Sequence, residues 1–342
     1  MYSFKNDYSE GAHPNLLEGL MKYNLEQVEG YGLDSWSEKA REAIKGKLEN
    51  EEVDIHFLVG GTQTNLLAIS AFLRPHEAVI ATTSGHIFVH ETGAIEATGH
   101  KVITVKGKKG KLSTEDIEEV LIYHTDEHMV KPKFVYISQS TEIGTIYTKA
   151  ELEALSEYCK KQNLLFYMDG ARLGSALTAE GNDVSLKDLA RLLDAFYIGG
   201  TKNGALMGEA LVICNPSLKE DFRYHIKQKG ALLAKGSVLG IQFLELFKED
   251  LFFELADHAN RMAALLRQAI KEEGYSFFTD SPTNQIFPIF PNLLIEKLQA
   301  TYDFYKWEKW DEGHSAVRLV TSWATPEEKV RDFIKDLKEW KK

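Results

Sequence analysis

The chain has 342 residues, 44% apolar and 27% charged, which predicts a globular protein of one large or two ordinary domains. Its net charge of −11 argues against nucleic acid as a partner, because phosphate contacts require clusters of Lys and Arg. We find no apolar run long enough for a membrane span and no apolar segment typical of a signal peptide. The two cysteines, Cys159 and Cys214, lack a metal-binding spacing, so we expect reduced thiols, no metal site and a cytoplasmic location.

Residues 1–50 are predicted to form an N-terminal arm. A short helix fits from Pro14 to about Tyr23, and a second helix begins at Asp34 or Ser35. Every fourth residue of the second helix is apolar: Trp36, Ala40, Ile44 and Leu48. Such an arm packs on the main domain or reaches a neighbouring subunit.

Residues 51–240 alternate short apolar strands with helices, which predicts an α/β domain with helices on both faces of a sheet. We expect strands at 55–59, 78–82, 102–105, 134–138, 164–168, 195–198 and 210–213. We expect helices at 62–73, 90–97, 114–122, 149–162 and 185–193. Only residues 199–209 separate the last two strands, and a parallel crossover needs about a dozen residues or more. The prediction is therefore a seven-stranded, mostly parallel sheet with one antiparallel strand.

Residues 241–342 are predicted to form a small C-terminal α+β domain. A long amphipathic helix is expected over residues 256–270, followed by short strands around 285–290 and 317–321. The last helix has a clear start signal, with Thr325 as N-cap, Pro326 at the first position and Glu328 completing a capping box.

One lysine and one aspartate each follow a predicted strand. Lys202 lies in the turn Gly199-Gly200-Thr201-Lys202, and Asp169 begins the turn Asp169-Gly170-Ala171-Arg172. A pyridoxal phosphate (PLP) site needs a Schiff-base lysine and an acid that faces the pyridine nitrogen. The alternatives are a solvated turn lysine and an aspartate that caps a helix.

Gly60-Gly61-Thr62 follows the first strand and begins a helix. Two glycines let the backbone approach an anion, and the helix N-terminus supplies free N–H groups. Neither a P-loop nor a dinucleotide fingerprint is present, so a single phosphate is the better match. The alternative is a tight turn in which Thr62 caps the helix.

Three further residues are candidates for binding a ligand. His86 follows the second strand, where open α/β sheets place ligand-binding residues, and it could stack on a flat ring. Arg172 follows the Asp-Gly-Ala turn, and Arg318 lies among apolar residues on a strand. A planar guanidinium suits an amino-acid carboxylate, although Arg318 could equally form a structural ion pair. Glu91 is a functional acid or a favourable charge in the first turn of a helix.

These motifs together resemble the threonine aldolase and β-eliminating lyase family of fold type I PLP enzymes. The match includes Gly60-Gly61-Thr62-Gln63-Thr64-Asn65, Gly85-His86 with Glu91, Met168-Asp169-Gly170-Ala171-Arg172-Leu173, Gly200-Thr201-Lys202 and Val317-Arg318-Leu319-Val320-Thr321. Their order and spacing match along nearly the whole chain.

The resemblance implies a role for each matched residue. Lys202 would bind PLP covalently, Asp169 would keep the ring nitrogen protonated, and His86 would stack on the ring. The implied cofactor-binding residues are Gly60, Gly61, Thr62, His86, Asp169, Arg172, Lys202 and Lys235, the last reaching the phosphate from a partner subunit. Tyr31 would likewise reach a neighbouring active site, so we expect a homodimer or homotetramer with shared active sites.

The resemblance also implies the substrate contacts. Arg172 and Arg318 would hold the substrate carboxylate, and His128 would lie near the substrate hydroxyl. Asn6 stands where family members commonly have a small hydroxyl residue near this carboxylate, and Thr141-Glu142-Ile143-Gly144 replaces the usual His-Asn-Gly. These departures surround the substrate rather than the cofactor.

We therefore expect a PLP-dependent lyase that cleaves the Cα–Cβ bond of a β-hydroxy-α-amino acid, with low specificity for threonine and allo-threonine. Its catalytic residues would be Lys202, His86, His128 and Asp169, and its products glycine and acetaldehyde. The base could be His86, His128 or a water. The alternatives are β-elimination from another amino acid and a non-catalytic protein on the same fold.

Overall fold

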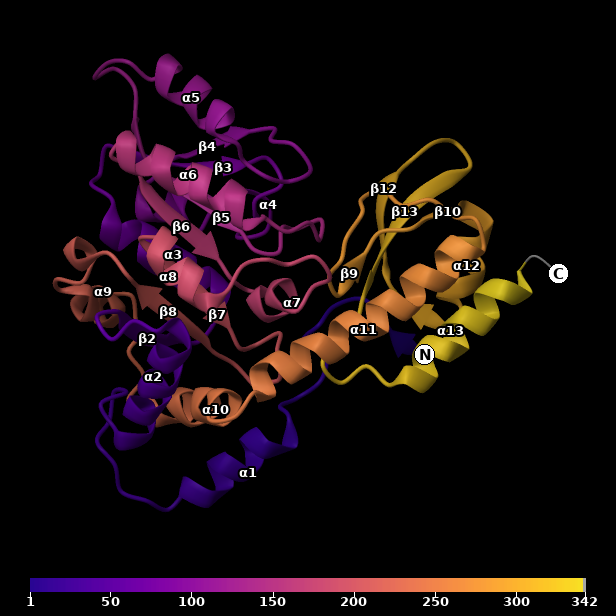
Figure 1. Ribbon diagram of the computed structural model, residues 1–342, viewed down its shortest axis with the longest axis horizontal. Helices are drawn as coiled ribbons and strands as arrows, with labels where there is room; N and C mark the ends of the chain where they lie inside the picture. Colours follow the sequence, from indigo (N-terminus) through magenta and orange to yellow (C-terminus); the bar gives the residue numbers. More distant parts are fainter. Residues whose placement is uncertain (341–342) are drawn as a thin grey trace.

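The computed structural model describes residues 1–340, and its largest feature is a seven-stranded sheet (Figure 1). The strands lie in the order β2-β8-β7-β6-β5-β3-β4. Their bounds are β2 Asp54–Leu58, β3 Glu77–Thr82, β4 Val102–Val105, β5 Lys131–Ser138, β6 Leu165–Asp169, β7 Ala195–Gly199 and β8 Glu209–Ile213. Neighbouring strands are parallel except that β8 runs antiparallel to both β2 and β7. The predicted mixed sheet with one reversed strand is confirmed.

Helices cover both faces of this sheet, because alternate side chains of a strand point to opposite faces. On β5, Val135 and Ile137 enter one hydrophobic core, whereas Phe134 and Tyr136 enter the other. The first core is closed by α2 (Ser35–Leu48), α5 (Thr114–Tyr123), α6 (Lys149–Lys161), α8 (Leu186–Leu192) and α10 (Ser237–Phe247). The second is closed by α3 (Gly61–Phe72), α4 (His86–Val89) and α9 (Phe222–Gln228). The strands are therefore apolar on both faces.

The long helix α11 (Leu251–Glu272) runs from the large sheet into a smaller α+β domain (Figure 1). The central strand of this domain, β13 (His314–Val320), pairs antiparallel with β9 (Gln285–Ile286), β10 (Ile289–Pro291) and β12 (Tyr305–Lys309). Its other helices are α12 (Asn292–Gln299) and α13 (Glu327–Glu339). Leu266, Phe290 and Phe333 are among the side chains of its core.

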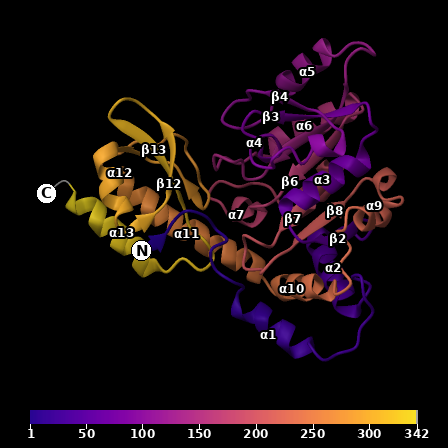
Figure 2. The same cartoon turned by 180° about the vertical axis from the view of Figure 1, so that it is seen from behind.

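The N-terminal residues complete the small domain, so the N-terminus lies beside the last helix, α13 (Figure 2). Strand β1 (Tyr2–Ser3) pairs in parallel with β11 (Tyr302–Asp303), and Phe4 is fully buried in the small-domain core. The chain then crosses to the large domain, where α1 (Pro14–Tyr23) packs on α10.

Two local predictions are wrong. Thr92 and Gly93 adopt left-handed φ angles of 53° and 71°, so the helix expected over 90–97 is replaced by α4 and the 3₁₀ helix η1 (Glu96–Thr98). The capping box at Thr325 does not form, because α13 begins after Pro326 without a side-chain cap. Instead Thr325 Oγ1 accepts a hydrogen bond from Ser322 N (2.8 Å).

The boundary predicted between residues 240 and 241 lies within α10. Phe243 and Leu246 of this helix belong to the core of the large sheet, so small-domain packing begins with α11. Two short helical segments of the large domain are α7 (Leu173–Leu177) and η2 (Pro216–Leu218). None of the helices in residues 1–340 combines the length and apolar character needed to cross a membrane.

Candidate active site

A cavity of about 660 Å³ lies between the carboxyl ends of the parallel strands and the β12–β13 hairpin. This is the edge where open α/β sheets bind ligands. Eight residues singled out in the sequence line it: Gly60, Gly61, Thr62, His86, Asp169, Arg172, Lys202 and Arg318. They come from five separate segments of the chain, so the fold brings together the turns at the ends of β2, β3, β6 and β7 with strand β13.

Asp169, the last residue of β6, is held as a buried carboxylate by four donors. Its Oδ1 accepts from Tyr197 OH (2.6 Å) and Ala171 N (3.0 Å), and its Oδ2 accepts from Tyr136 OH (2.6 Å) and Asn65 Nδ2 (2.9 Å). Burial alone would raise the pKa of Asp169, but nearby His86 and the side-chain hydrogen bonds outweigh it and lower this pKa. The carboxylate therefore stays charged, as an acid facing a pyridinium nitrogen must.

One amide positions both Asp169 and His86. Asn65 Nδ2 donates to Asp169 and also to Glu91 Oε1 (2.8 Å), and the same Glu91 oxygen is 2.8 Å from His86 Nδ1. Glu91 is buried, and its Oε2 has no hydrogen-bond partner in the described part of the chain. Glu91 thus orients the imidazole that the sequence predicts to stack on a cofactor ring, and it is more than a charge at a helix start.

The turn after β2 forms an uncapped helix N-terminus at the cavity. Gly60 is the N-cap of α3 and makes no side-chain capping bond, and Gly60, Gly61 and Thr62 all line the cavity. A Cβ on Gly61 would lie 2.9 Å from Tyr197 OH, so only glycine lets the backbone pass this close to the tyrosine that holds Asp169. Free N–H groups and the helix dipole make this a suitable phosphate site.

Lys202 follows β7 and enters the same cavity. Burial and the nearby Arg172 lower the pKa of Lys202, although Asp7, Asp169 and Glu209 oppose this change. A lowered pKa increases the fraction of free amine, the form that attacks a carbonyl carbon. These groups fit PLP: a lysine amine, a charged carboxylate for the ring nitrogen and a cradle for one phosphate.

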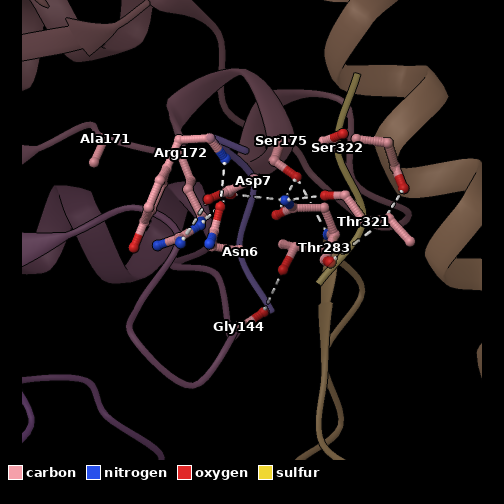
Figure 3. Close-up of polar contacts among 12 residues, drawn as sticks. Asn6, Asp7, Gly144, Ala171, Arg172, Ser175, Thr283, Thr321 and Ser322 are labelled. Atoms are coloured by element: carbon pink, nitrogen blue, oxygen red, sulfur yellow. Dashed lines mark hydrogen bonds and ion pairs between the residues drawn. The ribbon is translucent and has the colours of Figure 1, made fainter. Parts of the chain in front are cut away.

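Arg172 makes a buried ion pair that the sequence did not indicate. Its Nε and Nη2 donate to Asp7 Oδ2 (2.6 Å) and Oδ1 (3.0 Å), and Asn284 Nδ2 donates to Asp7 Oδ2 (3.0 Å). Figure 3 shows Asp7 between Arg172 and the polar residues Ser175 and Thr321. The N-terminal arm therefore joins the large and small domains beside the cavity, and Nη1 is the Arg172 nitrogen outside the ion pair.

Arg318, unlike Arg172, is surrounded by aromatic rings rather than by a carboxylate. Its guanidinium carbon lies 5.2 Å from the ring centroids of both Tyr305 and Trp307, and Nη2 donates to Lys5 O (3.3 Å). A β-bulge at Trp307 accompanies this arrangement. Among residues 1–340 no carboxylate forms a salt bridge with Arg318, and its buried Nε lacks any partner. Arg318 is thus the arginine with free capacity for an anionic ligand.

Four predicted residues lie elsewhere. His128 is exposed in the loop before β5, at the edge of the sheet opposite the cavity. It therefore cannot reach the cavity of the same chain. Tyr31 and Lys235 are exposed, and Lys227 Nζ lies over the Tyr31 ring at 4.8 Å. Asn6 does not line the cavity; its Oδ1 accepts from Tyr8 N and Ser9 Oγ, each at 3.0 Å. Within one chain these four residues are not part of the site.

Other cavity residues were not identified from the sequence. They are Tyr8, His90, Tyr197, Glu209, Gln285, Tyr305 and Trp307. Glu142, from the motif expected near the substrate, also lines the cavity. Glu142 Oε1 accepts from Ser138 Oγ (2.6 Å) and His86 N (3.0 Å), and burial raises its pKa. Glu209 is only 4% exposed, accepts from Gly200 N (3.2 Å), and has its pKa raised by burial to about 8. A usable signal existed for Glu209, because an acid at the start of an apolar strand is unusual.

Comparisons with known proteins agree with this geometry. Residues 11–290 match the family model described as β-eliminating lyase. The low specificity L-threonine aldolase of Pseudomonas aeruginosa is 32% identical over 98% of this chain and 96% of its own length. A structure of Leishmania major threonine aldolase is 52% identical, with a TM-score of 0.98 and 99% of both chains covered. Aspartate aminotransferase of Thermus thermophilus, 17% identical with a TM-score of 0.72 over 99% of this chain and 90% of its own, shares the fold.

Proposed function

Because the chain belongs to the β-eliminating lyase family, we propose that it is a PLP-dependent aldolase for β-hydroxy-α-amino acids. It would cleave threonine and allo-threonine, with low specificity, to glycine and acetaldehyde. The observation that carries the proposal is the convergence of Lys202, Asp169 and the unpaired Arg318 on one cavity. The similarity to the threonine aldolases of Pseudomonas aeruginosa and Leishmania major supports it.

The chain's own residues fit the steps of such a cleavage. PLP, when bound, supplies an electron sink for the pair released at the substrate Cα. Asp169 would hold a proton on the ring nitrogen, Lys202 would hold the cofactor covalently, and the turn at Gly61 and Thr62 would bind its phosphate. His86, fixed by Glu91, would lie against the ring. These roles follow from the position and charge of each group in the cavity.

Arg318 would bind the substrate carboxylate. The guanidinium lies 5.2 Å from the ring centroids of Tyr305 and Trp307, its Nε has no partner in the described chain, and its planar fork suits a carboxylate. Arg172, held in place by Asp7, would assist through Nη1. In this proposal Arg172 is a fixed support and Arg318 is the main group that binds the carboxylate.

Tyr31, Lys235 and His128 would require a second copy of the chain. We propose a cytoplasmic homodimer or homotetramer in which these exposed residues reach a neighbouring cavity. Light scattering of the purified protein tests this part, and a monomer at micromolar concentration would contradict it.

The reaction is tested by product analysis. Purified enzyme with PLP receives L-threonine, L-allo-threonine and phenylserine, and glycine, aldehyde, ammonia and keto acid are measured together. Glycine and aldehyde in equal amounts support the aldolase. Ammonia and keto acid without glycine would support β-elimination, in which Lys202 removes the Cα proton. Lys202→Ala is the negative control, with Lys229→Ala, at an exposed site, as its matched control; a protein that forms no product and shows no PLP absorbance band would be non-catalytic.

A further inference from the structure

His90 is a cavity residue whose ring is not bound by the protein. It follows the single turn of α4, four residues after His86, so the two side chains lie on the same face of that turn. Their ring centroids are 5.5 Å apart, and both rings line the cavity. His86 Nδ1 is engaged by Glu91, whereas the ring nitrogens of His90 make no hydrogen bond within residues 1–340.

We propose that His90 is the general base that removes the proton from the β-hydroxyl group of the substrate. This inference rests on the proposed aldolase function and names the base for it. The substrate carboxylate is assigned to Arg318 and the substrate amino group to the cofactor that Lys202 would hold, and His90 shares the cavity with both residues. An imidazole without a protein partner is available for the third polar group of the substrate, the β-oxygen.

The charges around His90 favour its neutral form. His90 is an exposed residue, but partial burial at the cavity lowers its pKa below the usual 6.5, and the positive charges of His86, Arg318, Lys202 and Arg172 lower this pKa further. The ionisable groups that line the cavity with it are Tyr8, His86, Glu142, Asp169, Arg172, Tyr197, Lys202, Glu209, Tyr305, Lys306 and Arg318, and Glu91 follows it in the chain. At neutral pH the ring can therefore accept a proton.

The other candidates are less suitable for this step. His86 is tied to Glu91 and is assigned to the cofactor ring. His128 is exposed at the opposite edge of the sheet. Oε1 of Glu142 already accepts two hydrogen bonds. His90 is the histidine of the cavity that remains free.

The proton and electron changes balance. His90 takes the proton of the β-hydroxyl, and the electron pair of that O–H bond forms the second C–O bond of the aldehyde. The Cα–Cβ bond breaks, and its electron pair remains with the Cα fragment, stabilised by the cofactor. A proton then adds to Cα, and glycine is released.

The test separates cleavage from a reaction that needs no β-hydroxyl group. Holoenzyme variants His90→Asn and His76→Asn, the latter at an exposed site before β3, are compared with the unmodified enzyme. We measure glycine release from threonine and the exchange of the glycine Cα proton in D₂O. His90→Asn should reduce kcat for cleavage about 100-fold or more, as general bases do, and leave the exchange rate within about threefold. His76→Asn should change neither rate.

The pH dependence adds a readout that a structural role would not change. The unmodified enzyme should lose kcat as the pH falls through the pKa of His90, below 6.5, and His90→Asn should lack this acid limb. NMR titration of the apoprotein should place the pKa of His90 in that same range.

Several outcomes would overturn the role of His90. They are cleavage by His90→Asn within about threefold of the unmodified rate, an equal loss of exchange and cleavage, or a His90 pKa above 7. Loss of cleavage in His128→Asn but not in His90→Asn would assign the base to a neighbouring copy. Production of ammonia and keto acid by the unmodified enzyme would instead overturn the proposed function, so the two failures are distinguishable.

Discussion

Asp7 and Arg172 form a bidentate ion pair across 165 positions of sequence, with N···O distances of 2.6 and 3.0 Å. Asp7 is 1% exposed, and Asn284 of the small domain donates to the same carboxylate. The N-terminal arm, the large domain and the small domain therefore meet at one charged contact beside the cavity.

Asp7→Asn should destabilise the protein and weaken substrate binding. It leaves Arg172 buried without its counter-charge, and breaking a buried pair in this way costs about 3–5 kcal/mol. The control is Asp303→Asn, which removes an exposed partner of Lys5 at 3.5 Å and should cost less than about 1 kcal/mol. Urea unfolding measures both changes, and equal midpoints for the two variants would contradict a structural role of Asp7.

Asp169→Asn should preserve the fold and lose most of the catalytic rate. The neutral amide cannot stabilise a protonated pyridine nitrogen, although its oxygen can still accept hydrogen bonds from Tyr136 or Tyr197. The measurements are kcat for threonine and circular dichroism. A kcat within about threefold of the unmodified enzyme, under about 1 kcal/mol of barrier, would show that the carboxylate does not have this role.

Arg318→Lys should raise KM for threonine about tenfold or more, equivalent to about 1.4 kcal/mol of binding. An ammonium lacks the planar fork that matches a carboxylate, and it cannot reproduce the contacts of the guanidinium with the Tyr305 and Trp307 rings. The PLP absorbance band should remain. The exposed Arg331→Lys is the control, and a lower unfolding midpoint with unchanged KM would assign Arg318 to packing alone.

Glu209→Gln should change how the stability of the apoprotein depends on pH. Burial raises the pKa of Glu209 from 4.5 to about 8, so between these values the folded state keeps a proton that the unfolded state releases. The free energy of unfolding therefore falls by about 1.4 kcal/mol per pH unit as the pH rises through this interval. Glutamine does not ionise, so this position causes no such decrease in the free energy of unfolding of Glu209→Gln.

The measurement is the difference in urea midpoint between Glu209→Gln and the unmodified protein at pH 5 and pH 8. The variant should gain relative stability at pH 8. Glu220→Gln, at an exposed site, should show the same difference at both pH values. An equal difference for Glu209→Gln at both values would mean that Glu209 is already ionised in the folded state.

The sheet and several residues that meet at the cavity were predictable because local patterns determine them. Strands such as β5 are short apolar runs, and residues 199–209 are too few for a parallel crossover, so the reversed strand followed from the sequence. Lys202 and Gly61 follow strands and Asp169 ends one, at the edge of the sheet where the topology gathers ligand-binding groups.

Individual side-chain contacts were not predictable in this way. Asp7 reaches Arg172 across 165 positions, and Glu209 reaches Gly200 N across the turn between β7 and β8. Trp307 lies near Arg318 at a β-bulge of the β12–β13 hairpin. Gln285 has both amide atoms buried without a partner, and no local pattern indicated that it faces the cavity. The helix predicted over 90–97 does not form because Thr92 and Gly93 adopt left-handed φ angles. A β-branched residue such as Thr92 rarely adopts this conformation, so the sequence did not indicate it.

The pairing of β1 with β11 also determines the order in which the site can be completed during synthesis. The ribosome releases all strands of the large sheet, which ends at Ile213, before residues 302–303 emerge. Tyr2 and Phe4 must wait for partners about 300 positions later, and Phe4 O accepts from Val320 N near the end of the chain. Arg318 and its carbonyl partner at Lys5 are therefore joined only when translation is almost finished, and a nascent chain stalled before β13 contains every strand of the large sheet but lacks Arg318.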